Sequence, residues 1–214
     1  PEMLLTNDWC LFDEVLSKKT CNRIIELGNK GFETASIEKN DAEITAEERI
    51  KGKKYEQGVN KKERECDIAW VKDQWIYQLI WPYMEEANEH ANWKFDIKAV
   101  EAIQLTRYKK GGFCGFHGDG RSDHLSAYNL PKNEFFHGKV RKLSMSILLN
   151  DDYEGGAFQF AQLVDRGESV TPTPGLYKAG SIIVFPSFMI HRVQPVTKGT
   201  RYSLVSWFLG PPFK

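Results

Sequence analysis

The sequence lacks the features that would place it in several common classes of protein. Only four cysteines occur in 214 residues, Cys10, Cys21, Cys66 and Cys114, and no two of them have the CxxC spacing of a zinc knuckle. They are too few and too scattered for a disulfide framework, so we expect reduced thiols. Lys plus Arg equals Asp plus Glu at 29 each, so net charge indicates neither nucleic-acid binding nor acidic disorder.

Long hydrophobic runs are missing as well. No stretch approaches the roughly 18 apolar residues of a membrane-spanning helix, and the opening residues, PEMLLTNDWCLFDEVL, lack the basic start and small-residue exit of a secretory signal. The composition, 41% hydrophobic and 27% charged, is that of an ordinary globular protein. We therefore expect a cytoplasmic protein without a membrane partner, folded as a single domain over residues 1–214.

The first 97 residues are predicted to form a helical support region interrupted by a charged loop. In SKKTCNRIIELGNKG, apolar residues recur at helical spacing, with Ser17 placed to cap the helix and Gly28 near its end. A second amphipathic pattern runs from Trp75 to Tyr83. Residues 36–65 between them are almost wholly polar, which predicts an exposed loop, either a solvated linker or a lid.

From about residue 98 to 209 the pattern changes to short β-type runs separated by Gly, Pro, Asp and Asn. The six runs are AVEAIQLTRY, KLSMSILLN, GAFQF, SIIVF, MIHRVQPV and TRYSLVSWFL. Short strands with turn residues and no helical pattern between them predict an antiparallel sandwich or barrel. The expected fold class is α+β, mainly β, with the N-terminal helices packed on the outside of the β core.

Three separated residues carry the candidate chemistry. GFHGDG holds His117 and Asp119, a pair that alone is typical of a glycine-rich turn. FPSFMIHRVQPV holds His191 in a strand-like run, where a single histidine is more often a core residue. Two histidines and one carboxylate together form the facial triad that binds non-haem Fe(II) and leaves other coordination positions open. The combination therefore predicts a metal site.

The last predicted strand offers an anion-binding residue. Period-two alternation places Arg201, Ser203 and Trp207 on the same face. An inward arginine costs free energy unless it meets an anion, and a guanidinium pairs with a carboxylate in bidentate geometry. A structural salt bridge would also satisfy Arg201, so this residue alone leaves both roles open.

Together these motifs resemble those of the 2-oxoglutarate- and Fe(II)-dependent dioxygenases, most closely the prolyl 4-hydroxylase-like branch. The resemblance spans roughly residues 100–209 and rests on Tyr108-x-x-Gly111 before the HxD pair, on LLNDDYEGGAFQF and on AGSIIVFPSFMIHRVQPVTKGTRYSLVSW. It implies a double-stranded β-helix core of the jelly-roll, cupin-like type. It also implies Fe(II), 2-oxoglutarate and O2 as reactants, with ascorbate as a reductant, and hydroxylation of a peptide or protein residue, foremost proline, with release of succinate and CO2.

The resemblance also assigns roles to residues of this chain. The implied iron ligands are His117, Asp119 and His191. The implied cosubstrate-binding residues are Arg201, which would bind the distal carboxylate of 2-oxoglutarate, with Tyr108 and Ser203. Arg141 and Trp207 match positions that approach the peptide substrate. Arg141 lies in the basic stretch KVRKL and could equally be a solvated surface residue, and Trp207 could be a core residue.

Two departures from the family pattern leave the substrate open. Cys114 stands where many members have a second tyrosine, and Arg201 stands where prolyl 4-hydroxylases proper often have lysine. The arginine points to lysyl, bacterial prolyl-type or oxygen-sensing prolyl hydroxylases. The carboxylate of Asp119 favours hydroxylation over halogenation, because related halogenases give up this ligand.

Other functions remain as alternatives. The chain could act on another side chain, a free amino acid or alkylated nucleic acid, or be an inactive peptide-binding module of the same fold. Nucleic acid is disfavoured, because repair enzymes usually carry a second arginine where this chain has Trp207. A hydrolytic zinc site using Asp123 and His124 is disfavoured by spacing that does not match HxHxDH. The segment 120–140 is either a part of the substrate groove, which it would line or cover together with residues 36–65, or an ordinary surface loop.

Overall fold

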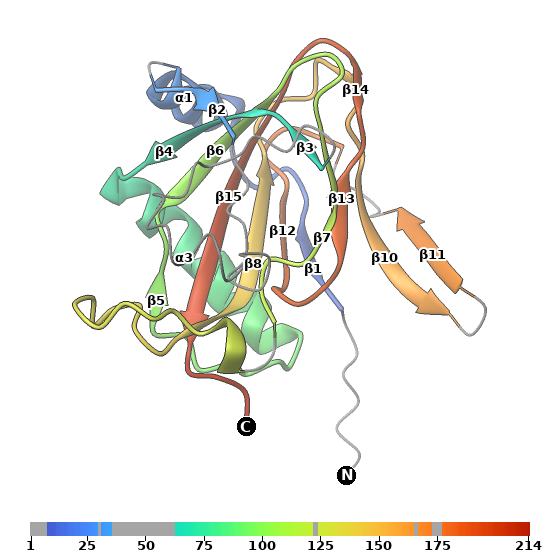
Figure 1. Cartoon of the computed structure of the whole chain (residues 1–214). Coiled ribbons are helices and arrows are strands. Elements are labelled where there is room, and N and C mark those ends of the chain that lie inside the picture. The colour runs from blue at the N-terminus through green and yellow to red at the C-terminus, as the bar shows by residue number, and fades with distance from the viewer. Residues whose placement is uncertain (1–7, 30, 36–62, 122–123, 165–166, 173–176) are drawn as a thin grey trace, which may run out of the picture.

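Two antiparallel β-sheets packed face to face form the core of the protein in the computed structural model (Figure 1). The structure describes residues 8–29, 31–35, 63–121, 124–164, 167–172 and 177–214. The larger, eight-stranded sheet has the order β1 (Cys10–Phe12), β12 (Ile182–Pro186), β8 (Val140–Leu148), β15 (Arg201–Gly210), β6 (Ile103–Tyr108), β4 (Asp67–Val71) and β2 (Glu33–Thr34), with β5 (Ala99–Val100) also paired to β15. The five-stranded sheet has the order β11 (Gly167–Pro172), β10 (Phe158–Val164), β13 (His191–Val193), β7 (Phe113–His117) and β3 (Arg64–Glu65).

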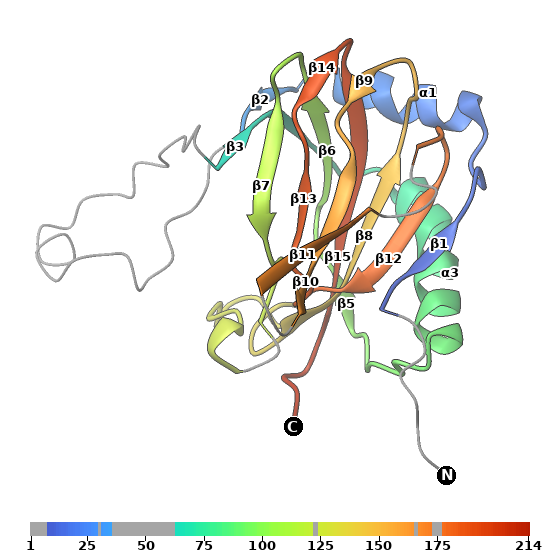
Figure 2. The same ribbon diagram turned by 90° about the vertical axis from the view of Figure 1, so that its right-hand side faces the viewer.

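A short ribbon, β9 (Glu154–Gly155) with β14 (Val196–Lys198), completes the strands. It lies at the end of the molecule from which β15 starts (Figure 2). Gly155 has φ of +77°, and a Cβ there would come within 2.5 Å of the carbonyl oxygen of Pro195. The GG pair of the sequence motif is therefore required by this tight turn.

Two helices cover the outer face of the larger sheet (Figures 1 and 2). Helix α1 (Lys18–Gly28) starts as predicted, because the Ser17 hydroxyl accepts a hydrogen bond from the backbone N–H of Thr20 at 3.1 Å. Helix α3 (Gln74–His90) includes Pro82 and extends beyond the predicted pattern. Among the described residues, no helix is both long and apolar enough to cross a membrane.

Side-chain alternation separates an apolar core from a polar interior. On β8, Leu143, Met145 and Ile147 face the helices and belong to the main hydrophobic cluster. The alternate positions face the smaller sheet, and on the central strands they are largely polar: Gln104, Thr106, Tyr108, Ser144, Ser146, Arg201 and Ser203, all buried. Burying polar side chains costs free energy, so an interior whose only role was to stabilise the fold would be lined with apolar side chains. The polar space between the two sheets therefore has the character of a binding site.

Several sequence predictions need correction. The region 1–97 is not simply helical, because it contributes β1, β2, β3 and β4 to the two sheets. The charged loop does not extend to residue 65, since Arg64 and Glu65 form β3 and pair with Cys114 and Phe113 of β7. The remainder of that loop, residues 36–62, lies outside the described residues. Strands β7 and β11 were not predicted as separate strands.

Candidate active site

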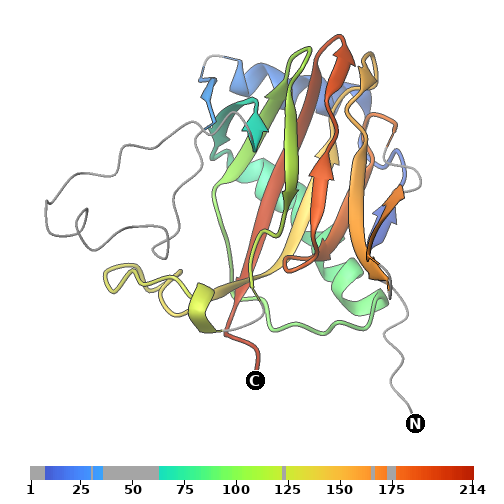
Figure 3. The same cartoon turned by 45° about the vertical axis from the view of Figure 1, so that its right-hand side comes forward.

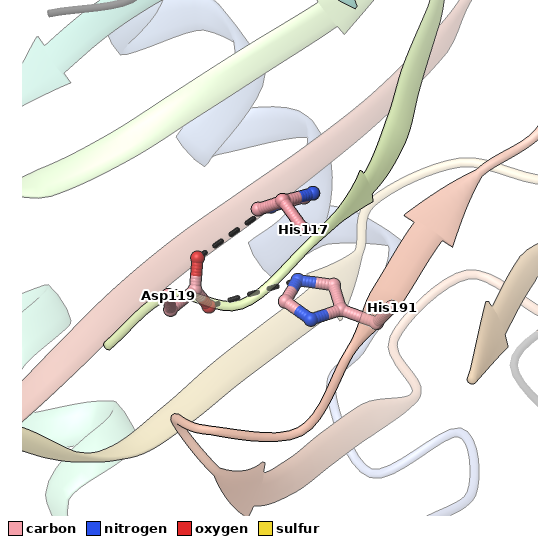
Figure 4. A group of neighbouring side chains, drawn as sticks. All are labelled: His117, Asp119 and His191. Atoms are coloured by element: carbon pink, nitrogen blue, oxygen red, sulfur yellow. Dashed lines mark ion pairs between the residues drawn. The ribbon is translucent and has the colours of Figure 1, made fainter. Parts of the chain in front are cut away.

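The three candidate metal ligands meet at the end of the smaller sheet where β7 ends and β13 begins (Figure 4). Asp119 Oδ1 lies 3.6 Å from His117 Nε2, and Asp119 Oδ2 lies 3.6 Å from His191 Nε2. All three potential ligand atoms lie within 4.8 Å of one another. In the part of the chain that the structure describes, this is the one group of three or more His, Cys, Asp or Glu side chains with metal-binding proximity.

A β-bulge turns His117 toward its partners. His191 pairs with His117 and Val193 pairs with Cys114. Between these two pairs β7 advances by three residues while β13 advances by only two, so β7 contains one extra residue. The extra residue reverses the alternation of the strand, which puts His117 on the same face as the buried Cys114. Phe116 points outward instead, where the guanidinium of Arg192 lies 4.4 Å from its ring centroid.

Both histidine rings present Nε2 to Asp119. The Nδ1 atom of His117 lies 2.8 Å from the carbonyl oxygen of Gly115, and that of His191 lies 3.0 Å from the carbonyl oxygen of Met189. A carbonyl only accepts hydrogen bonds, so each Nδ1 carries hydrogen and donates. This backbone contact is the usual orientation device for a metal-binding histidine and leaves Nε2 as the ligand atom.

Charge and burial fit a cation between these groups. Burial raises the pKa of Asp119, but His191, His117 and Arg141 outweigh it and hold the pKa well below its usual range. Burial lowers the pKa of His117, yet Asp119 and Cys114 raise it to about 11. Burial dominates at His191 and lowers its pKa. Both shifts of pKa at His117 and Asp119 favour a positive charge beside the Asp119 carboxylate, and a bound cation would supply one.

Asp119 Oδ2 supplies the clearest sign of a missing partner. It is a buried oxygen with no hydrogen-bond donor, which is rare for a carboxylate. The three potential ligand atoms, all within 4.8 Å of one another, lie close enough together for one cation to be held among them. Phe158 and Phe185, with ring centroids 5.4 and 4.8 Å from that of His191, hold this ring in place.

Arg201 is the first residue of β15 and pairs with Tyr108 of β6. It is 1% exposed, donates from Nη1 to the Ser203 hydroxyl at 2.9 Å, and places its guanidinium carbon 5.5 Å from the Tyr108 ring centroid. Its Nε has no hydrogen-bond partner, and no carboxylate among the described residues pairs with it. An unpaired buried guanidinium is costly, so the site is prepared for an anion.

Arg141 and Trp207 lie together beside Asp119. Arg141 belongs to β8, which starts at Val140 and so earlier than predicted, and its guanidinium carbon lies 4.1 Å from the Trp207 ring centroid. Its Nη1 donates to the backbone carbonyl of Asp119 at 3.1 Å. Arg141 is therefore not a solvated surface arginine. Trp207 is 7% exposed, and its indole N–H has no partner.

Glu101 is a residue of this site that the sequence did not single out. Its carboxylate forms a bidentate pair with Arg141, with Nε and Nη2 each 2.7 Å from a carboxylate oxygen. It also accepts a hydrogen bond of 2.7 Å from the Tyr128 hydroxyl. Glu101 follows a strand of ordinary appearance and lies 40 residues from Arg141, so no local pattern marks the pair.

The segment after the HxD pair lies at the end of the molecule where β7 ends and β13 begins (Figure 3). It contains the 3-10 helix η2 (His124–Ser126), and Tyr128 anchors it to Glu101. His124 does not join His117, Asp119 and His191. Residues 122 and 123, including Asp123, lie outside the described residues.

Comparison with known proteins identifies the family. Residues 103–209 match the model of the 2OG-Fe(II) oxygenase superfamily, and the chain belongs to this family. Among curated relatives, a PKHD-type hydroxylase of Synechococcus sp. (strain CC9902) is 35% identical over 113 residues, which cover 52% of this chain and 42% of that protein. A PKHD-type hydroxylase of Stenotrophomonas maltophilia (strain R551-3) is 32% identical over 104 residues, 49% of this chain and 41% of that protein. The matched segment thus spans less than half the length of these relatives.

Solved structures support the fold over nearly the whole chain. The viral collagen prolyl hydroxylase of Paramecium Bursaria Chlorella virus-1 superposes with a TM-score of 0.61 at 17% identity, covering 96% of this chain and 97% of that one. A Pseudomonas putida prolyl-4-hydroxylase gives a TM-score of 0.60 at 20% identity, covering 95% and 93%. The prediction of a mainly β, double-stranded β-helix fold with helices on the outside is confirmed.

Proposed function

We propose that this protein is a 2-oxoglutarate- and Fe(II)-dependent dioxygenase that hydroxylates a residue, foremost proline, within a peptide or protein. The single observation that carries the proposal is the triad of His117, Asp119 and His191 brought together at one end of the smaller sheet, with the orphaned Oδ2 of Asp119 facing His191. Two imidazoles and one carboxylate are the donor set of non-haem Fe(II) oxygenases.

The residues present fit the metal and its cosubstrate. His117, Asp119 and His191 would hold Fe(II) through two Nε2 atoms and a carboxylate oxygen. Arg201, with Ser203 and Tyr108 beside it, would bind the distal carboxylate of 2-oxoglutarate, since its Nε is free to donate. Iron, 2-oxoglutarate and O2 together supply the oxidant that inserts one oxygen atom into a C–H bond, with succinate and CO2 as the other products. Ascorbate belongs to the proposal as an external reductant.

The protein's own residues orient the reactants and exclude water. The carbonyls of Gly115 and Met189 fix the two imidazoles, so each Nε2 lone pair points at one position. Phe158, Phe160 and Phe185 surround His191 and keep that side of the site apolar. This packing would keep water away from His191 and shield the surrounding protein from the oxidant.

Arg141 favours a peptide over a free amino acid as the substrate. Its positive charge is already neutralised by Glu101, and three of its five N–H groups donate within the protein. The remaining N–H groups suit an uncharged acceptor, such as a peptide carbonyl, better than a carboxylate. Trp207 adds an unpartnered indole N–H and an aromatic surface beside the same position.

The proposal is tested by turnover. Purified protein with Fe(II), 2-oxoglutarate, ascorbate and O2 is incubated with a library of proline-containing peptides, and succinate and the peptide masses are measured together. The expected result is succinate formation that rises with particular peptides, each gaining the mass of one oxygen atom. Succinate formation that depends on iron but is stimulated by free amino acids or alkylated oligonucleotides would replace the proposed substrate class and keep the reaction.

A further inference from the structure

Arg141 is fixed more firmly than a residue that only touches substrate would need. Glu101 binds both Nε and Nη2 of its guanidinium at 2.7 Å, and the side chains are 24% and 12% exposed for Arg141 and Glu101. Bidentate pairs between arginine and a carboxylate combine strength with geometric specificity. The pair therefore sets the plane of the guanidinium.

Glu101 is itself held by the strand that carries Trp207. Val100 pairs with Phe208 of β15, and Gln104 pairs with Val205 of the same strand. The chain between β5 and β6 thus advances by four residues while β15 advances by three, which leaves one extra residue opposite β15. Glu101 lies in this irregular stretch, and its backbone N–H donates to the carbonyl of Trp207 at 3.0 Å. An extra residue of this kind re-aims a side chain, and here the carboxylate meets Arg141.

The opposite edge of the guanidinium reaches the metal centre. The peptide unit after Asp119 is bound at both ends: its carbonyl accepts from Arg141 Nη1 at 3.1 Å, and its N–H, on Gly120, donates to the carbonyl of Ser187 at 3.0 Å. A Cβ on Gly120 would lie 3.1 Å from the Cβ of Arg141, so the two residues pack closely. The orientation of this peptide determines where the Asp119 side chain points.

We propose that Glu101 is a positioning residue of the metal centre, which holds Arg141 against the Asp119–Gly120 peptide and thereby keeps the Asp119 carboxylate facing His117 and His191. This inference rests on the proposed function, because it requires the triad to bind a metal. Removing a group that contacts a metal ligand, but not the metal itself, typically lowers metal affinity by about 10- to 100-fold. We expect about tenfold for Glu101, which acts through one intermediate side chain.

The experiment is a titration with Co(II) alone, which is stable in air and reports its ligand field by visible absorption. It compares the unaltered protein with Glu101→Gln, Arg141→Lys and the double variant. Asp96→Asn is the matched control, because it also removes one negative charge from the segment before β6 but affects a side chain that is 56% exposed and paired with Lys98. The affinity of the Co(II)-loaded protein for 2-oxoglutarate and the thermal midpoint are measured in parallel.

We expect Glu101→Gln and Arg141→Lys each to weaken Co(II) binding by about tenfold, and the double variant to be no weaker than the weaker single variant, because both act through one chain of contacts. The affinity for 2-oxoglutarate should stay within about threefold of the original value, since Arg201 is untouched, whereas general structural damage would lower both affinities.

The outcomes separate the inference from the proposed function. Failure of the unaltered protein to bind Co(II) would contradict the metal site itself. Normal Co(II) binding with Glu101→Gln within about twofold of it, or with an equal loss in Asp96→Asn, would overturn the positioning role alone. If Glu101→Gln does not fold, Arg141→Lys decides the matter, because it retains the positive charge but lacks the fork that spans Glu101 and Asp119.

Discussion

Replacing Arg201 with methionine should weaken 2-oxoglutarate binding without weakening the fold. Arg201 is 1% exposed, its Nε is unpaired, and the described residues offer it only the Ser203 hydroxyl as a hydrogen-bond acceptor. In a structural salt bridge the arginine would stabilise the empty protein. In a ligand-binding role the arginine destabilises the ligand-free protein, because only a bound anion offsets the free-energy cost of burying its charge.

The two roles predict opposite magnitudes. Removing one partner of a buried, hydrogen-bonded charge pair costs about 2–5 kcal/mol of binding free energy, which corresponds to a loss of affinity of about 30-fold to several thousand-fold. Replacing even a paired buried charge and its partner by apolar side chains is often neutral or stabilising by about 1–4 kcal/mol, so replacing a buried charge that has no partner should not destabilise the protein. Arg201→Met should therefore bind 2-oxoglutarate at least about 30-fold more weakly and unfold at an equal or higher denaturant concentration.

Calorimetric titration of 2-oxoglutarate into Mn(II)-loaded protein, together with urea unfolding of the metal-free protein, measures both quantities. Arg107→Met is the matched control, because Arg107 lies on the neighbouring strand and pairs with Asp67 at 2.8 Å. That variant should lose about 1 kcal/mol of stability or less and retain its 2-oxoglutarate affinity. An Arg201→Met protein that binds 2-oxoglutarate normally, or one that is destabilised more than Arg107→Met, would contradict a ligand-binding role for Arg201.

Three further predictions follow from individual residues. Asp119→Ala should reduce Co(II) affinity in a titration by about 100-fold or more, since it removes the only anionic ligand, and an affinity within about tenfold would exclude Asp119 as a ligand. Gly210→Ala should destabilise the protein by about 1–3 kcal/mol in urea unfolding, because its Cβ would overlap the carbonyl oxygen of Asp96, whereas Gly31→Ala, which the described residues beyond its chain neighbours do not approach within 4 Å, should be neutral; equal effects would contradict this packing. Burial raises the pKa of the Cys21 and Cys66 thiols to about 11 and leaves their side chains nearly inaccessible, so both should react slowly with an aromatic disulfide reagent at pH 8 in the folded protein and rapidly in urea, as followed by absorbance and peptide mapping; fast labelling of either in the folded protein would contradict it.

Much of this architecture could be predicted because its signals are local. Ser17 caps α1 as its position suggested, and the alternation of the last strand placed Arg201 and Ser203 together on one face. His191 could be grouped with His117 and Asp119 because two imidazoles and one carboxylate form a known metal-binding set, although His191 is distant in the sequence. The structure brings the three residues together. Local periodicity and ligand chemistry are sufficient for such features.

The remaining features depend on pairing between distant segments. The bulge between Cys114 and His117 exists only relative to β13, so the sequence FCGFH gave no sign of it. Likewise, Arg141 could be read as a solvated residue until its partner Glu101, 40 residues away, was seen beside it. A basic stretch such as KVRKL does not indicate which of its cations will pair with a buried carboxylate, because that depends on the register of β8 with β15.

The most direct test of the account is an anaerobic titration of the metal-free protein with Fe(II) and then with 2-oxoglutarate, followed by visible absorption. We expect a metal-to-ligand charge-transfer band that requires both components, saturates at one equivalent of each and is lost in Asp119→Ala. Folded, iron-loaded protein that gives no such band with excess 2-oxoglutarate would contradict the assignment of His117, Asp119, His191 and Arg201 to a dioxygenase site.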